Sequence, residues 1–133
     1  MIILETTILI RMTHNDKEVL SKLRRYNSSN LATTAISIYE LYIGAYVAKS
    51  YRAQKVKDIV NLTRGLKVLP YESSAAKQSA LICSELMASK AITHPREWTA
   101  DILIAGVARS FNTLLITSDQ HFKKMKGLQM EFW

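Results

Sequence analysis

The sequence is poor in the residues that staple small domains together. Its only cysteine is Cys83, and its three histidines, His14, His94 and His121, lie far apart in the chain. One cysteine cannot close an intramolecular disulfide, and scattered histidines lack the paired spacing of a structural zinc site. We therefore expect a chain that folds without either device and that works in the reducing cytoplasm.

Glycine, proline and long apolar runs are also scarce. The chain has 4 glycines and 2 prolines in 133 residues, with 48% hydrophobic and 22% charged residues, which excludes a disordered, collagenous or low-complexity protein. The longest mostly apolar stretch, 35–48, contains Glu40 and is too short to cross a bilayer. No basic segment precedes the apolar start, so we expect neither a secretory signal nor a membrane protein.

Acidic residues are the minority among the charged ones. The 18 Lys and Arg residues exceed the 11 Asp and Glu residues and give a formal net charge of +7. This excess favours polyanionic partners such as nucleic acid or acidic protein tails. Because many basic proteins bind neither, the charge alone does not assign a partner.

Short apolar runs alternate with helical patterns along the chain. Strands are predicted at residues 2–4, 31–36, 67–71, 113–117 and 129–133, with helices between them. This alternation is typical of an α/β sandwich of three layers, in which helices cover both faces of a mainly parallel sheet. Because no repeat, linker or change of composition interrupts the chain, we expect one domain over residues 1–133.

Hydroxyl side chains mark the expected helix starts. A threonine near Thr7 is the candidate cap of the first helix, and Ser37 with Glu40 forms a capping-box pattern after the second strand. Ser73 or Ser74 is the candidate cap of a long later helix.

Four carboxyl groups are predicted to meet at one edge of the sheet. The carboxyl ends of parallel strands and the starts of the helices beside them share an edge, where ligands of such folds bind. Two of the acids follow strands directly and two lie in the first turns of helices; they are Glu5, Asp119, Glu40 and Asp101.

Such convergence has an energetic cost. Two like charges about 5 Å apart repel by roughly 3 kcal/mol at an effective dielectric near 20. Either some carboxyls stay protonated with raised pKa values, or a cation neutralises them. Oxygen ligands suit Mg²⁺ or Mn²⁺ better than zinc. Taken singly, Glu40 is also explained by a capping box, Asp101 and Asp119 by helix N-termini, and Glu5 by a solvated strand end.

The segments around these acids resemble the PIN-domain family, specifically its short VapC-type toxin ribonucleases. The resemblance covers essentially the whole chain. In order, the matching segments are IILETTILI at 2–10, ISIYELYIG at 36–44, DILIAGVA at 101–108 and LLITSDQHF at 114–122. The third of these segments is the most specific match.

The resemblance implies an endoribonuclease that depends on Mg²⁺ or Mn²⁺ and is the toxin of a toxin–antitoxin pair. It also implies a homodimer that a small antitoxin protein neutralises. Carried over by position, Glu5, Glu40, Asp101 and Asp119 form the catalytic set. Three of them, Glu5, Asp101 and Asp119, are the metal ligands. The supporting hydroxyls are Thr6 and Thr117.

Basic and aromatic residues suggest where partners bind. Three lysines that follow the last acid are the candidate contacts to the RNA backbone: Lys123, Lys124 and Lys126. Tyrosines around the second acidic segment fit either core packing or an interface with an antitoxin or a second subunit. These tyrosines are Tyr39, Tyr42, Tyr46 and Tyr51.

One position departs from the family pattern, because Glu5 stands where the family usually has Asp. The extra methylene is about 1.5 Å long, whereas productive geometry tolerates errors of only about 0.5 Å. A non-catalytic or weakly active PIN-like module that binds RNA or protein is therefore the alternative function. A phosphoacceptor domain is disfavoured because no second acid adjoins Glu5.

Overall fold

Five parallel strands form the central sheet of the protein. The computed structural model describes all residues 1–133. Along the sheet the strand order is β3-β2-β1-β4-β5, and every neighbouring pair is parallel. The strands are β1 (Ile2–Leu4), β2 (Leu31–Thr34), β3 (Lys67–Leu69), β4 (Leu114–Thr117) and β5 (Gln129–Phe132). The predicted parallel sheet is therefore confirmed.

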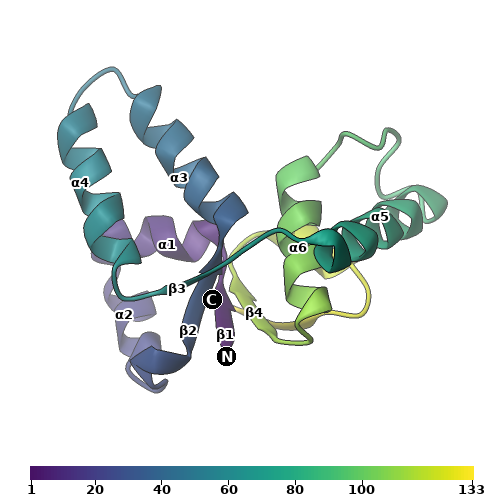
Figure 1. Cartoon of the computed structure of the whole chain (residues 1–133), viewed down its shortest axis with the longest axis horizontal. Coiled ribbons are helices and arrows are strands. Elements are labelled where there is room, and N and C mark those ends of the chain that lie inside the picture. Colours follow the sequence, from purple (N-terminus) through teal and green to yellow (C-terminus); the bar gives the residue numbers. More distant parts are fainter.

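Helices cover both faces of this sheet (Figure 1). One layer contains α1 (Thr6–Thr13), α2 (Lys17–Leu23), α3 (Ala35–Tyr46) and α4 (Arg52–Thr63). The other contains α5 (Ser73–Ala88) and α6 (Thr99–Ser110). Short 3₁₀ turns lie at Ser28–Asn30 and Gln120–Lys124. No helix has the length and apolar character needed to cross a membrane.

The two layers bury alternate residues of the same strands. Ile3 and Leu115 belong to the cluster under α5 and α6, whereas Leu4 and Ile116 belong to the cluster under α1–α4. Successive side chains of a strand point to opposite faces, so a short apolar run can supply both cores. Each fully buried side chain of this kind contributes roughly 1.5–3 kcal/mol.

Helices α5 and α6 approach each other closely at Gly106. A Cβ atom at this position would lie 1.9 Å from Ser79 Oγ and 2.7 Å from the carbonyl oxygen of Ala75. Glycine is therefore required by the packing of the two helices. The hydroxyl of Ser79 is buried in this contact without a hydrogen-bond partner.

The order of elements matches the prediction, but the predicted caps do not. Strand β2 ends at Thr34, whose Oγ1 accepts a 3.0 Å hydrogen bond from Ser37 N, so the cap of α3 lies three residues earlier than expected. The predicted capping box of Ser37 and Glu40 is wrong. Helix α5 has no side-chain cap from serine, because Glu72 is its N-cap residue. Helix α1 is capped by Glu5 and not by a threonine.

Candidate active site

Glu5 lies at the carboxyl end of β1 and caps α1. Its side chain is buried, with 2% of the residue exposed. A single carboxylate oxygen, Oε2, accepts hydrogen bonds from Thr7 N at 2.9 Å, Thr7 Oγ1 at 2.5 Å and Thr117 Oγ1 at 2.9 Å. The longer chain of Glu therefore folds back on its own helix, and Oε1 accepts none of these bonds.

The segment after β4 is fixed by its own polar groups and by α1. Asp119 N donates to Thr117 Oγ1 at 2.9 Å, and Ser118 N donates to Thr7 Oγ1 at 3.0 Å. Asp119 Oδ1 accepts from His121 N at 2.9 Å, which makes Asp119 the cap of the following 3₁₀ turn. The second Asp119 oxygen, Oδ2, takes part in none of these bonds.

Glu40 faces the same edge from the second turn of α3. Thr6 Oγ1, in the first turn of α1, donates a 2.5 Å hydrogen bond to Glu40 Oε2. This bond joins two residues 34 positions apart in the sequence and brings α1 and α3 together. Thr6, predicted as a supporting hydroxyl, thus contacts one of the predicted acids, and Thr117 contacts another.

Asp101 lies in the first turn of α6, where it meets a residue that the sequence did not identify. His121 Nδ1 lies 2.8 Å from Asp101 Oδ2 and 3.6 Å from Asp119 Oδ1. The imidazole stacks on the Trp98 ring, with centroids 4.2 Å apart and planes inclined by 17°. The one signal in the sequence is the place of His121, two residues after Asp119 at the start of a turn.

The electrostatics of the site are those of converging carboxyls. Burial is the main cause that raises the pKa of Glu5, of Glu40 and of Asp101. Nearby negative charge adds to the rise: Glu40 acts on Glu5, and Asp119 acts on both Glu40 and Asp101. The predicted acids therefore lie close enough that their negative charges disfavour the charged forms of Glu5, Glu40 and Asp101.

The donors of this site fit a divalent cation. Asp101, Asp119 and His121 each offer a ligand atom, and these atoms lie within 4.8 Å of one another. Two carboxylates and one imidazole can hold Mn²⁺ or a similar ion. The positive charge of such an ion would offset the mutual repulsion of the acids. Glu5 and Glu40 are not in this compact set, and the metal-binding role of Glu5 stays a prediction.

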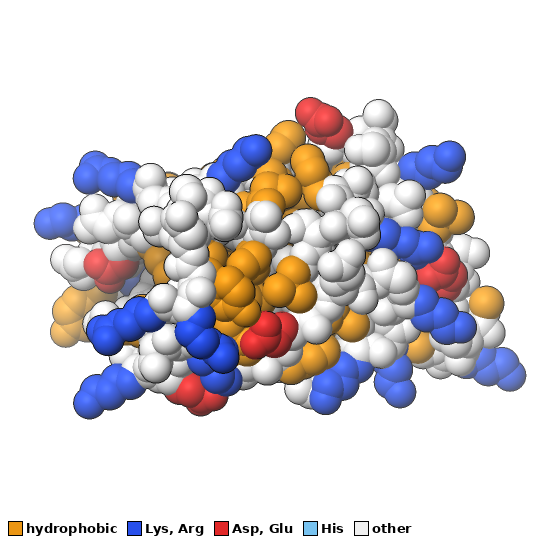
Figure 2. Space-filling model, turned by 90° about the horizontal axis from the view of Figure 1, so that it is seen from below, with side chains coloured by type: hydrophobic (Ala, Val, Ile, Leu, Met, Phe, Trp, Pro, Cys, Tyr) orange, Lys and Arg blue, Asp and Glu red, His pale blue; other side chains and the backbone are white.

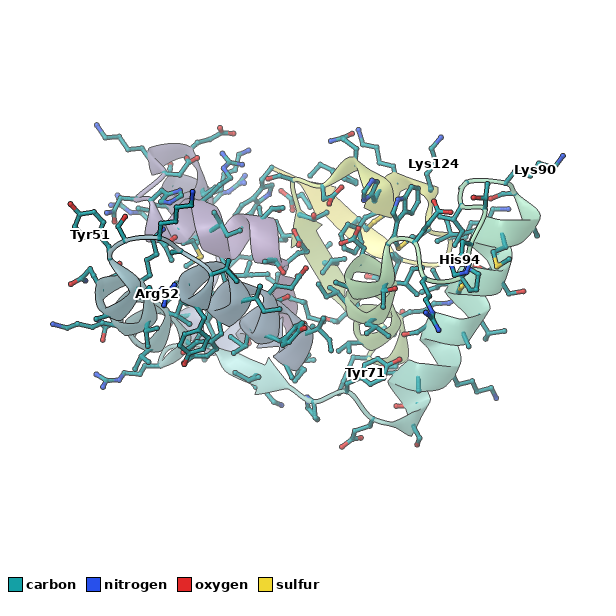
Figure 3. All side chains as sticks on the ribbon, turned by 90° about the horizontal axis from the view of Figure 1, so that it is seen from above. Tyr51, Arg52, Tyr71, Lys90, His94 and Lys124 are labelled. Atoms are coloured by element: carbon teal, nitrogen blue, oxygen red, sulfur yellow. The ribbon has the colours of Figure 1, made fainter.

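The predicted lysines lie next to the acidic cluster, across Trp98. Lys123, Lys124 and Lys126 line a cleft of about 680 Å³ together with Lys90 and Trp98. Lys123 Nζ also lies 4.8 Å from the centroid of the Phe132 ring. Seen from the carboxyl edge, Lys90 and Lys124 are on the α5–α6 side of the molecule (Figure 3).

A second cavity opens on the other side of the acids. Between α1, α3 and α4 lies a groove of about 430 Å³, which Glu40 lines together with apolar residues such as Ile10 and Leu41. Tyr51 lines it too and is 79% exposed. Tyr39 and Tyr46 are exposed, whereas Tyr42 packs against the core. Core packing is therefore confirmed for Tyr42, and an interface at the exposed tyrosines stays a prediction.

A doubly wound parallel α/β sheet with an acidic cluster at its carboxyl edge defines the class of this protein. The match to a family model makes the assignment specific. The model of the PIN domain matches residues 2–128, so the chain belongs to the PIN domain family. The resemblance inferred from the four acidic segments is thereby confirmed.

Solved structures similar to this chain include several VapBC proteins, one of them described as a member of the VapBC family of toxin–antitoxin systems. VapBC2 from Rickettsia felis, bound to a DNA fragment from its promoter, has a TM-score of 0.88 and 22% identity, covering 100% of this chain and 99% of that chain. VapBC-1 from nontypeable Haemophilus influenzae has a TM-score of 0.83 and 25% identity, with coverages of 100% and 98%. VapBC-5 from Mycobacterium tuberculosis has a TM-score of 0.72 and 26% identity, with coverages of 98% and 94%. The search of curated proteins returns no match.

Proposed function

We propose that the protein is a metal-dependent endoribonuclease and the toxin of a toxin–antitoxin pair that acts in the cytoplasm. The observation that carries the proposal is the convergence of Glu5, Glu40, Asp101 and Asp119 from four separate elements at one edge of the sheet. A fold alone does not assign an activity. Here the carboxylates repel one another, and a bound cation would explain why the fold nevertheless brings them together. The chemistry that such a cation permits would explain their use.

Each acid has a distinct proposed role. Asp101 and Asp119 would hold Mg²⁺ or Mn²⁺ with help from Glu5, whose Oε2 is engaged with α1 and Thr117. When bound, the ion lowers the pKa of a water molecule and offsets charge on the phosphodiester oxygens. Glu40, fixed by Thr6, orients the attacking water. No serine or cysteine nucleophile is needed.

The lysine cleft supports RNA as the substrate. Lys90, Lys123, Lys124 and Lys126 surround one cleft beside Trp98, which in turn stacks on the site residue His121. Lysines bind RNA phosphates and supply affinity without base specificity. Because the cleft lies next to the acidic cluster, phosphates bound there would place the neighbouring part of an RNA strand near the acids. On the opposite edge of the molecule, basic side chains are spread around the rim (Figure 2).

Cleavage of RNA tests this proposal. Purified protein is incubated with total cellular RNA in Mg²⁺, in Mn²⁺ and with excess chelator, beside an Asp101→Asn variant prepared in the same way. We expect discrete products with either ion, none with chelator and none from the variant. Equal cleavage by the wild type and the variant would identify a contaminating nuclease and contradict the proposal.

A second candidate function is RNA binding without cleavage. It is favoured by the three hydrogen bonds that engage Glu5 Oε2, which limit how this longer acid serves a cation. Retained RNA binding without metal-dependent products would support this alternative. A Glu5→Asp variant that gains strong cleavage would show that Glu at this position suppresses the activity of an otherwise complete site.

We also propose a small antitoxin and a second copy of this chain as partners. The similar structures named above are VapBC proteins, one of them described as a member of a family of toxin–antitoxin systems, which supports the first partner. The exposed apolar residues beside the groove, including Ile10, Ile43 and Tyr46, offer contact area for either protein. Light scattering on the isolated chain distinguishes a monomer from the expected dimer.

A further inference from the structure

His121 brings one ring nitrogen close to two carboxylates of the acidic cluster. Its Nδ1 lies 2.8 Å from Asp101 Oδ2, within hydrogen-bond distance, and also 3.6 Å from Asp119 Oδ1. One ring nitrogen thus faces two carboxylates that belong to different elements.

Three neighbouring contacts fix the direction of this nitrogen. The His121 backbone N–H is held by Asp119 Oδ1 at 2.9 Å, and the ring lies flat against Trp98. The next residue, Phe122, is completely buried and anchors the turn in the core. The imidazole edge is therefore held toward the carboxylates and does not swing freely, although 44% of the side chain is exposed.

The distances from His121 Nδ1 to the two carboxylates are compatible with ligands around one ion. Two donors that lie about 2.1 Å from an octahedral ion at a right angle are about 3 Å apart. The two distances from His121 Nδ1 to the carboxylates bracket this value. The same three residues form the one compact group of metal-ligating side chains in the molecule.

We propose that His121 Nδ1 is a metal ligand beside Asp101 and Asp119, and that it makes the site prefer Mn²⁺ to Mg²⁺. This inference rests on the metal site of the proposed function. Mg²⁺ favours oxygen ligands and retains water, whereas first-row transition ions bind imidazole more readily. A nitrogen ligand therefore favours binding of Mn²⁺ over Mg²⁺, a preference that carboxylate ligands alone would not give.

Pulsed electron paramagnetic resonance of bound Mn²⁺ tests the inference without an activity measurement. The wild type should show modulation from a directly coordinated ¹⁴N nucleus, which changes to the ¹⁵N pattern when the protein is made with ¹⁵N-histidine. His121→Phe, which keeps an aromatic ring to stack on Trp98, should lose the coupling. The control His94→Gln, in the loop before α6 (Figure 3), should retain it.

Affinities measured in parallel give the second readout. We expect His121→Phe and His121→Asn to weaken Mn²⁺ binding by roughly tenfold or more, while Mg²⁺ binding changes far less. Bound Mn²⁺ without nitrogen coupling in the wild type would overturn the inference and leave the nuclease proposal standing. Absence of any Mn²⁺ binding would instead overturn the metal site on which both depend. The isotope experiment on the wild type decides the question even if both variants misfold.

Discussion

Thr117 Oγ1 donates a 2.9 Å hydrogen bond to Glu5 Oε2 and thereby joins the carboxyl ends of two neighbouring strands. The same oxygen accepts a 2.9 Å hydrogen bond from Asp119 N. One fully buried hydroxyl therefore positions two of the acids that the proposed mechanism needs. Loss of this hydroxyl should affect the stability of the fold and the geometry of the site together.

Thr117→Val tests this link. The variant keeps the shape of the side chain but loses both hydrogen bonds, so we expect the free energy of unfolding to fall by about 1–2 kcal/mol. Metal affinity should fall as well, because Asp119 loses the contact that orients its backbone. The matched control is Thr113→Val, directly before β4, where Oγ1 of the threonine donates a hydrogen bond to Met1 O at 2.5 Å. A similar loss of metal affinity in both variants would refute a specific role for Thr117.

The raised pKa values predict how stability depends on pH. Burial raises the pKa of Glu5, Glu40 and Asp101 in the folded protein, so the folded state keeps protons that the unfolded chain releases. In the metal-free protein, the stability that these three groups contribute should therefore decrease as the pH rises from the ordinary carboxyl pKa of about 4 through the raised values.

Asp101→Asn isolates this effect from the other titrating groups. The variant lacks one carboxyl whose pKa is raised, so its Tm should exceed that of the metal-free wild type near neutral pH. The difference in Tm should vanish toward about pH 4. Carboxyls with lowered pKa values, such as Asp16, are present in both proteins and cancel in the comparison. A Tm difference that is the same at every pH would contradict the predicted sign. Addition of Mn²⁺ should raise the Tm of the wild type more than that of the variant.

The sequence predicted the order of elements well because its buried strands are short, β-branched and separated by clear helical patterns. The acids could be placed at one edge because parallel topology sends strand ends and adjoining helix starts to the same side. The pairing of Asp101 with His121 was beyond reach, since it depends on how the turn after β4 packs against α6. The cap of α3 was misjudged because Thr34 and Ser37 both precede the same apolar run, and only tertiary contacts choose between them.

The contact at Gly106 predicts a large effect from a small substitution. Gly106→Ala would place a methyl group against Ser79 Oγ and the Ala75 carbonyl, so α5 and α6 must separate. We expect a loss of about 1–3 kcal/mol in the free energy of unfolding, measured by urea denaturation. Ser79→Ala removes a buried hydroxyl that has no partner and should be neutral or stabilising. A neutral Gly106→Ala would show that the helices are packed less tightly.

The lysine cleft predicts a change in the salt dependence of RNA binding. In an Asp101→Asn background, which leaves RNA intact, Lys124→Ala and Lys126→Ala should each weaken binding. Each should also lower the slope of log affinity against log salt by about 0.7 for single-stranded RNA. Lys57→Ala, an exposed lysine on α4, is the control and should leave the slope unchanged. Equal slopes in all three variants would place the RNA elsewhere.

Calorimetric titration of the purified chain with Mn²⁺ tests the central claim, that carboxylates distant in the sequence share one divalent ion. The account predicts one saturable site per chain. Its affinity should fall by about tenfold or more in Asp101→Asn and equally in Asp119→Asn. Glu18→Gln, which removes an exposed acid that pairs with Lys22 on α2, should bind like the wild type. Wild-type protein without saturable binding, or variants that bind as the wild type does, would contradict the account.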